Sequence, residues 1–545
     1  MSTVLERPLP ETAADREAEQ RWSKSRRLRP GPRLTEDLTL LGVAGGAYFA
    51  LGVWLLRSEH ILVFDGLARL SHAFFVFWNS PPKLTAIGFV WPPVETLVFL
   101  PFALIRPLAT SLLALPLMSA FCGGLLLLVL NRLFELGGMR PWQRYPLLLV
   151  FGANPMIAFY AANGMAEIVY LFLLVGGIYS FVRWYLTRAA GPLVSASMFF
   201  SLGILTRYEV FSWALLLVVP ITLVSIRQRV HRSELEGTLL TYLAPIAYSM
   251  GLWLFFNWLI EGSPLFWLRQ QAPGAPLSPG AAAPHVASTT LSPLRIAEKL
   301  VALNWELFPP VVIAVIVLLA VALVRKDWMT WTLIAMLLVN AAFTWLIVVG
   351  SGSVEYFQLR YNMRAMPIAV ASIAWLYLLA RGRRRHLVWA ASLLSLAVAI
   401  PFTLHTMRVY PYQFREQAFV NAVEGKGGLP DPLVGARKVA SWVDAQVHQR
   451  DAILTDDSQT FAVMLLSGRP DLFLDRIDHG DARWLAVRDN PWGTVRYMLM
   501  ITGGPDLIAA KYPKAGEGAN PGLTPVFRSQ NYILLRVAAK PPAAR

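Results

Sequence analysis

The sequence predicts an all-α polytopic membrane protein with a small C-terminal α/β domain. Of its 545 residues, 55% are hydrophobic and only 15% are charged, whereas soluble proteins carry about 25% charged residues. Apolar stretches near the length that spans a bilayer, about 20 residues, recur through residues 37–404, and the chain returns to a soluble composition after residue 404. These observations indicate a membrane region followed by a soluble one.

Membrane topology accounts for the basic residues. The formal net charge is +15, but Lys and Arg gather in short segments between apolar stretches, as in cytoplasmic loops, so we expect no nucleic-acid partner. The Arg-rich polar tail, residues 1–36, is predicted to be disordered and cytoplasmic. The single cysteine, Cys122, allows no intrachain disulfide and no thiolate metal cluster.

About eleven transmembrane helices are expected. With a cytoplasmic N-terminus in the cell (inner) membrane, an odd number of spans places residues 405–545 outside the cytoplasm. The expected spans are 37–56, 111–131, 145–161, 167–184, 193–206, 210–226, 237–259, 306–324, 329–349, 364–381 and 386–404.

Two long outer loops interrupt this series. The first, residues 57–110, contains an apolar stretch broken by Trp91-Pro92-Pro93 and by Pro101, which favours juxtamembrane or re-entrant helices over a span. The second, residues 260–305, is rich in Pro, Ala and Gly and is predicted to be mobile.

The C-terminal region alternates helix and strand patterns, which favours a small α/β domain. A helix is expected over Gly435–Val447. Asp456 and Asp457 follow the first strand, and a solvated loop is favoured there over a metal site. The expected strands are Ala452–Thr455, Leu472–Leu474, Tyr497–Met500 and Tyr532–Leu535.

Charged residues at the outer ends of the spans are candidates for function, because charge near a bilayer is costly. Asp65 is followed by Arg69 and His72 at helical spacing, so it could serve as a base or merely pair with Arg69. Glu167 opens a span, where the helix dipole alone would also favour an acid.

Several basic residues could bind an anion. Arg207 and Glu209 interrupt an apolar stretch, and Arg suits a phosphate because its planar fork donates two hydrogen bonds; a purely structural ion pair is the alternative. Arg360 and Arg364, four residues apart, could clamp a phosphate or anchor the helix at the lipid headgroups. Lys83 and Tyr356 are further candidates near the same face.

Common nucleotide-binding and hydrolase motifs are missing from the sequence. It contains no G-x-x-x-x-G-K-[ST], G-x-G-x-x-G, H-E-x-x-H or G-x-S-x-G. ATP-driven transport by this chain alone and serine hydrolysis therefore lack support.

The order of these segments resembles the GT-C superfamily of membrane glycosyltransferases, in particular its protein O-mannosyltransferase and aminoarabinose lipid A transferase branch. The chain departs from that pattern at Asp65, where many relatives have Asp-Glu, and at Trp91, where they have His. The segments that carry the resemblance are Asp65 after the first span, GFVWPPVETLVFLP, Glu167 in NGMAE, LGILTRYE, NWLIEGSPLFW and RYNMRAMP.

The resemblance implies a transferase that moves a hexose or pentose from a polyprenyl-phosphate donor to an acceptor hydroxyl on the outer side. It implies Asp65 as the base and Glu167 as a residue that orients hydroxyl groups. Glycan, lipid and protein acceptors stay open. No metal is required, although some relatives use one and the outer acids could hold a divalent cation. Residues that would bind the lipid phosphate or the sugar are Lys83, Arg207, Glu209, Tyr356, Arg360 and Arg364.

Two other functions compete with this one. A transporter or flippase of a lipid-linked or anionic solute would place charges on both sides of a central path. A non-catalytic membrane scaffold would present the C-terminal domain to partners.

Overall fold

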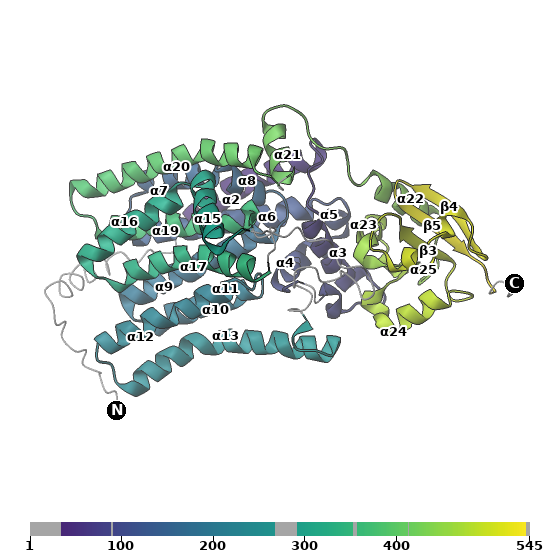
Figure 1. Ribbon diagram of the computed structural model, residues 1–545, viewed down its shortest axis with the longest axis horizontal. Coiled ribbons are helices and arrows are strands. Elements are labelled where there is room, and N and C mark those ends of the chain that lie inside the picture. Colours follow the sequence, from purple (N-terminus) through teal and green to yellow (C-terminus); the bar gives the residue numbers. More distant parts are fainter. Residues whose placement is uncertain (1–33, 89–90, 267–290, 352–356, 412–413, 541–545) are drawn as a thin grey trace.

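The computed structural model describes residues 34–88, 91–266, 291–351, 357–411 and 414–540. At residues 351 and 477–481 it describes the backbone alone. The predictions for Tyr356 and for most of the tail lie outside these residues. A bundle of long helices forms one end of the molecule and an α/β domain forms the other, with the short helices α3, α4 and α5 between them (Figure 1).

The described part of the chain contains eight helices or helix pairs that are long and apolar enough to cross a membrane. A ninth span is present if α15 and α16, which meet at 106°, count as one. The eight are α2 (Leu34–Arg57), α6 (Ala114–Leu136), α9 (Ala166–Thr187), α11 with α12 (Val210–Leu216 and Val218–Arg227), α13 (Arg232–Glu261), α17 (Trp328–Ser351), α18 with α19 (Leu359–Asn362 and Ala365–Leu379) and α20 (Arg383–Val409).

All eleven predicted segments are helical, but three of them are shorter than a span or bent. Segment 145–161 divides into α7 (Pro141–Gly152) and α8 (Pro155–Tyr160), because Asn154 caps a new helix and Pro155 begins it. The other two are α10 (Ala190–Ile204) and the bent pair α15 (Pro293–Leu307) and α16 (Pro310–Arg325).

The first predicted loop, residues 57–110, contains short helices as predicted, whereas the second, residues 260–305, is more helical than its composition suggests. Within residues 57–110 lie α3 (Phe64–Trp78), the 3-10 helix η2 (Leu84–Ile87), α4 (Val94–Ala103) and α5 (Arg106–Thr110). Within 260–305, the part from Pro293 onward is the start of α15 rather than loop, because the Ser292 side chain caps the helix and Pro293 occupies its first position.

The C-terminal domain is built on a five-stranded sheet with strand order β2-β1-β3-β5-β4. β1 pairs in parallel with β2 and β3, and β5 pairs antiparallel with β3 and β4. The strands are β1 (Ile453–Thr455), β2 (Phe473–Leu474), β3 (Tyr497–Ile501), β4 (Leu523–Ser529) and β5 (Tyr532–Val537). The helices are α21 (Phe414–Val423), α22 (Val434–Gln446), α23 (Asp457–Ser467), η4 (Pro470–Leu472), α24 (Arg476–Asp489), α25 (Leu507–Lys511) and η5 (Ala515–Glu517).

Four of the strands and the helix at 434–446 confirm the sequence prediction. β4 was missed because Pro525 breaks the strand pattern. It is tolerated here since β4 is an edge strand with a register shift between Pro525 and Phe527.

One continuous apolar core joins the two ends of the molecule. It runs from the spans through Phe74 and Phe75 of α3 to Val463 and Leu465 of α23 and Leu499 of β3. The C-terminal domain is therefore packed onto the membrane region rather than tethered to it.

Candidate functional site

The site begins at the first turn of α3, which carries Asp65. The positive end of the helix dipole favours an acid at this position. The next residue, Gly66, packs directly on the backbone before α9: a Cβ added at Gly66 would lie 2.5 Å from the carbonyl oxygen of Gly164. Only glycine allows this approach, which brings Asp65 close to the start of α9 and hence to Glu167.

Asp65 forms an ion pair with Arg360, which comes from α18 almost three hundred residues later, with a distance of 3.2 Å between Oδ2 and Nη1. Its side chain is 36% exposed, more than the other acids of the site. Burial raises the pKa of Asp65, but the guanidinium charges of Arg360, Arg69 and Arg415 outweigh it and hold the pKa below its ordinary value. The carboxylate is therefore ionised at neutral pH and accessible.

Arg207 lies at the centre of a second, more buried group of charges. It occupies the break between α10 and α11, and its Nη1 is 2.8 Å from Glu167 while its Nη2 is 3.3 Å from Glu209. Glu209 also accepts a 2.7 Å bond from Arg364 at the start of α19. Glu209 thus holds two guanidinium groups side by side.

Aromatic rings support these arginines. The ring of Tyr361 has Arg207 at 5.2 Å, Arg360 at 5.1 Å and Arg364 at 4.9 Å from its centroid. The ring centroid of Tyr170, on α9, also lies 6.0 Å from the Arg364 guanidinium. Three cations around one ring need negative charge nearby, which the acids supply only in part and an anionic ligand would complete.

A third ion pair closes the site from the loop side. Arg69, one turn after Asp65 on α3, lies 2.7 Å from Glu95 of α4, and both are almost fully buried. Trp91 covers Arg69 at 4.9 Å, and the His72 ring lies 6.4 Å from Trp91. Trp91, one of the two positions at which the sequence departs from the pattern it resembles, therefore makes a cation–π contact with Arg69.

Two further residues, Tyr160 and Glu416, lie beside the charged cluster and are not marked by any sequence pattern. Tyr160 at the end of α8 donates a 2.6 Å hydrogen bond to Glu416 of α21, and both are buried. Glu416 escaped notice because it lies in a segment of soluble composition, where an acid is unremarkable. Its neighbour Arg415 adds positive charge near Asp65.

Six of the eight predicted site residues are brought together: Asp65, Glu167, Arg207, Glu209, Arg360 and Arg364. Lys83 precedes η2 on the loop after α3, and its role stays a prediction. Asp456 and Asp457, expected in a solvated loop, are instead buried at the start of α23, where the Asp456 side chain caps the helix.

Several buried polar atoms of the site have no hydrogen-bond partner among the described residues. They are Glu167 Oε2, Tyr170 OH, Arg207 Nε and Arg360 Nε. Such atoms are rare in proteins because each costs free energy, so they are consistent with a site that receives a polar ligand. Within the described ranges, no three His, Cys, Asp or Glu side chains group closely enough to hold a metal ion.

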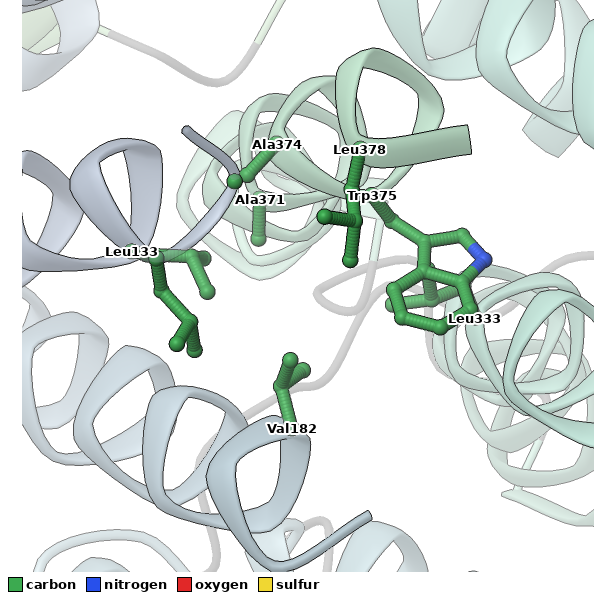
Figure 2. A pocket seen from close by; sticks show the side chains of 9 residues that line it. Leu133, Val182, Leu333, Ala371, Ala374, Trp375 and Leu378 are labelled. Atoms are coloured by element: carbon green, nitrogen blue, oxygen red, sulfur yellow. The ribbon is translucent and has the colours of Figure 1, made fainter. Parts of the chain in front are cut away.

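A separate apolar cavity lies far from these charges. It is lined by Leu133, Val182, Leu333 and Trp375, among others, and encloses only about 10 Å³ (Figure 2). Val182 follows Glu167 by fifteen residues on α9, which is about 22 Å along a helix. The cavity is too small and too distant to belong to the site.

Two crystal structures of ArnT from Cupriavidus metallidurans align with nearly the whole chain. The apo structure is 14% identical, covers 93% of this chain and 99% of its own, and has a TM-score of 0.56. The structure bound to undecaprenyl phosphate is 15% identical, covers 92% and 97%, and has a TM-score of 0.52.

The chain has a GT-C fold. The bundle of apolar helices and the small C-terminal domain confirm the predicted fold class, and the eight spans identified among the described residues support a multi-pass membrane protein. No protein-family model matches the chain, and no curated protein matches it significantly.

Proposed function

We propose that this chain is a membrane glycosyltransferase that moves a sugar from a polyprenyl-phosphate donor to an acceptor hydroxyl on the extracytoplasmic side. The observation that carries the proposal is the charged cluster: an accessible, ionised Asp65 pairs with Arg360, and Arg360 surrounds one tyrosine ring together with Arg207 and Arg364. The GT-C fold supports it, since one structure with that fold is described with undecaprenyl phosphate bound.

The arginines differ in what they can offer a ligand. Arg360 is 21% exposed, Arg207 is 14% exposed, and Arg364 is only 3% exposed. Arg360 is therefore the most accessible to an incoming phosphate, and Arg207 is the next. Arg364, paired with Glu209, contributes positive charge and contacts the ring of Tyr361.

Phosphate binding also prepares the base. In the structure Arg360 is bonded to Asp65. A phosphate that draws Arg360 away removes a positive charge from beside the carboxylate, so the pKa of Asp65 rises toward the range in which it accepts a proton well. Donor binding and base activation are then the same event.

The transfer step follows from these positions. The acceptor oxygen forms a bond to the anomeric carbon while its proton passes to a carboxylate oxygen of Asp65. The bond between the anomeric carbon and the phosphate oxygen breaks, and its electron pair stays on the lipid phosphate. The guanidinium groups stabilise the charge that develops there. Attack opposite the leaving group inverts the anomeric configuration, and no metal ion is needed.

Glu167 and Tyr170 fit the sugar. Each carries a buried polar atom without a partner among the described residues, Oε2 and the phenol OH respectively. Sugar hydroxyls both donate and accept hydrogen bonds, so they would satisfy both atoms. Tyr356 and Lys83 remain proposed contacts of the donor.

The decisive experiment is identification of the bound lipid. Protein purified in nanodiscs is extracted, and the lipids are identified by mass spectrometry for the wild type and for Arg207→Ala. Polyprenyl phosphate or its sugar conjugate in the wild type, lost in the variant, supports the transferase. Bulk phospholipid alone in both, together with uptake or flipping of a lipid-linked solute in proteoliposomes, overturns it in favour of a transporter.

A further inference from the structure

The helix that carries Asp65 is held at both ends by the C-terminal part of the chain. Figure 1 shows α3 and α5 between the helix bundle and α23 of the α/β domain. Asp65 lies at the start of α3 and Asn79 caps its end, fourteen residues later, which is about 21 Å along a helix. Because α3 is a short and continuous helix, a shift of its last turn also moves its first turn, which carries Asp65.

At the far end, the contacts are polar and buried. The Asn79 amide donates a 3.1 Å hydrogen bond to Asp475 Oδ2, immediately after β2, and both residues are almost completely buried. Beside them, Arg106 of α5 donates to the carbonyl oxygen of Gly468, the residue that ends α23. Arg106 also lies 5.4 Å from the ring of Trp78, in the last turn of α3.

At the near end, the contact is between backbones. The amide of Leu429 donates a 2.8 Å hydrogen bond to the carbonyl oxygen of Glu59, in the short link between α2 and α3. Gly428 touches the same backbone so closely that a Cβ there would clash with Glu59. The segment leading into the α/β domain therefore fixes the chain just before Asp65.

A third attachment reaches the site itself. Glu416, on α21 at the beginning of the C-terminal part, bonds Tyr160 beside the charged cluster. The apolar core is continuous across all three attachments. Desolvated polar contacts of this kind set geometry, because breaking one leaves a buried group unsatisfied.

We infer that the C-terminal domain is a positioning element of the site: by holding the last turn of α3 and the link that precedes its first turn, it fixes Asp65 relative to Arg360. Its effect on catalysis rests on the proposed transferase function, whereas its effect on α3 does not. Asn79, Asp475 and Arg106 are positioning residues, since they act on the site only through α3.

The test exchanges the partners of the buried bond. Asn79→Asp places two carboxylates together in a buried site, and the double variant Asn79→Asp/Asp475→Asn restores an amide-to-carboxylate bond with its direction reversed. Hydrogen–deuterium exchange of the amides from Leu67 to Arg69 is measured in the full-length protein, together with kcat and the Kd for polyprenyl phosphate. Tyr512→Phe, which removes a hydrogen bond to Arg488 within the α/β domain, is the matched control.

We expect Asn79→Asp to raise exchange at these amides at least tenfold and to lower kcat at least tenfold, with Kd changed less than threefold. The double variant should recover both, and the control should change neither. Exchange that rises only within the α/β domain, or a kcat that is unchanged despite faster exchange in α3, overturns the inference.

Two safeguards keep the outcomes distinct. If Asn79→Asp does not fold, Arg106→Ala removes the Gly468 hydrogen bond and the contact with the Trp78 ring but keeps the Asn79–Asp475 bond, and it should give a smaller change of the same kind. No change in α3 exchange then overturns the inference. If the wild type transfers no sugar from any polyprenyl-phosphate donor, the proposed function fails, and α3 exchange alone decides whether the C-terminal domain positions the helix.

Discussion

Asp65→Asn separates the chemistry of the site from its stability. The substitution removes the proton acceptor but keeps the size of the side chain. Loss of a general base lowers a rate by about 10²- to 10⁴-fold, so we expect kcat to fall by at least that lower figure. The ion pair with Arg360 is partly exposed, at 36% and 21%, and pairs of this kind contribute about 1 kcal/mol or less. The fold should therefore survive.

The same substitution makes a prediction of opposite sign for the donor. In the wild type a phosphate must compete with Asp65 for Arg360. Removing that competition returns up to about 1 kcal/mol to binding, which corresponds to roughly fivefold tighter binding. We expect the Kd for polyprenyl phosphate to fall or stay the same while kcat collapses.

The assay combines transfer from a labelled polyprenyl-phosphate sugar with a direct binding measurement in nanodiscs. The matched control is Asp489→Asn, another partly exposed aspartate paired with an arginine, Arg488, but located at the end of α24 in the C-terminal domain. Transfer within tenfold of the wild type would show that Asp65 is not the base. Loss of phosphate binding would show that it binds the donor or organises the cluster instead.

Four other outcomes are expected. Gly66→Ala should lower the transfer rate by about 10²-fold, because the added Cβ would lie 2.5 Å from the Gly164 carbonyl oxygen and displace α3. The control Gly42→Ala, whose Cβ would meet no atom within 4 Å, should leave the rate unchanged. Equal rates in the two variants would contradict the proposed packing role of Gly66. Arg364→Met removes one of the two arginine partners of Glu209 and should cost about 1–3 kcal/mol, seen as a lower unfolding temperature in detergent. Burial, followed by the charge of the neighbouring Asp456, raises the pKa of Asp457 to about 7. The stability that its protonated carboxyl contributes is therefore present at acidic pH and is lost as the pH rises through 7. The free energy of unfolding should depend less on pH in Asp457→Asn, by up to ~4 kcal/mol, as measured by thermal unfolding at a series of pH values. Chelation with EDTA should leave the transfer rate unchanged, and a loss restored by a divalent cation would assign a metal to the site.

Much of the site was visible in the sequence because charge stands out against an apolar background. Arg207 and Glu209 interrupt a hydrophobic stretch, and Arg360 and Arg364 open another, so their cost in a bilayer marks them for function. Glu416 also contacts the site, through its hydrogen bond with Tyr160. It lies in a segment where acidic residues are common, and no local pattern distinguishes it. Tyr361 lies in the same segment as Arg360 and Arg364 but is not a predicted site residue, because a tyrosine near a membrane surface is ordinary.

The sequence by itself determined the membrane region, its helices and the α/β domain, because these depend on hydrophobicity, helix caps and strand patterns that act over a few neighbouring residues. Only the tertiary structure decided which charges meet. Asp65 and Arg360 are 295 residues apart, and Tyr160 and Glu416 are 256 apart. Their pairing depends on how closely α3 approaches α9 at Gly66 and on how the C-terminal domain holds α3, and packing between distant segments leaves no local signature in the sequence.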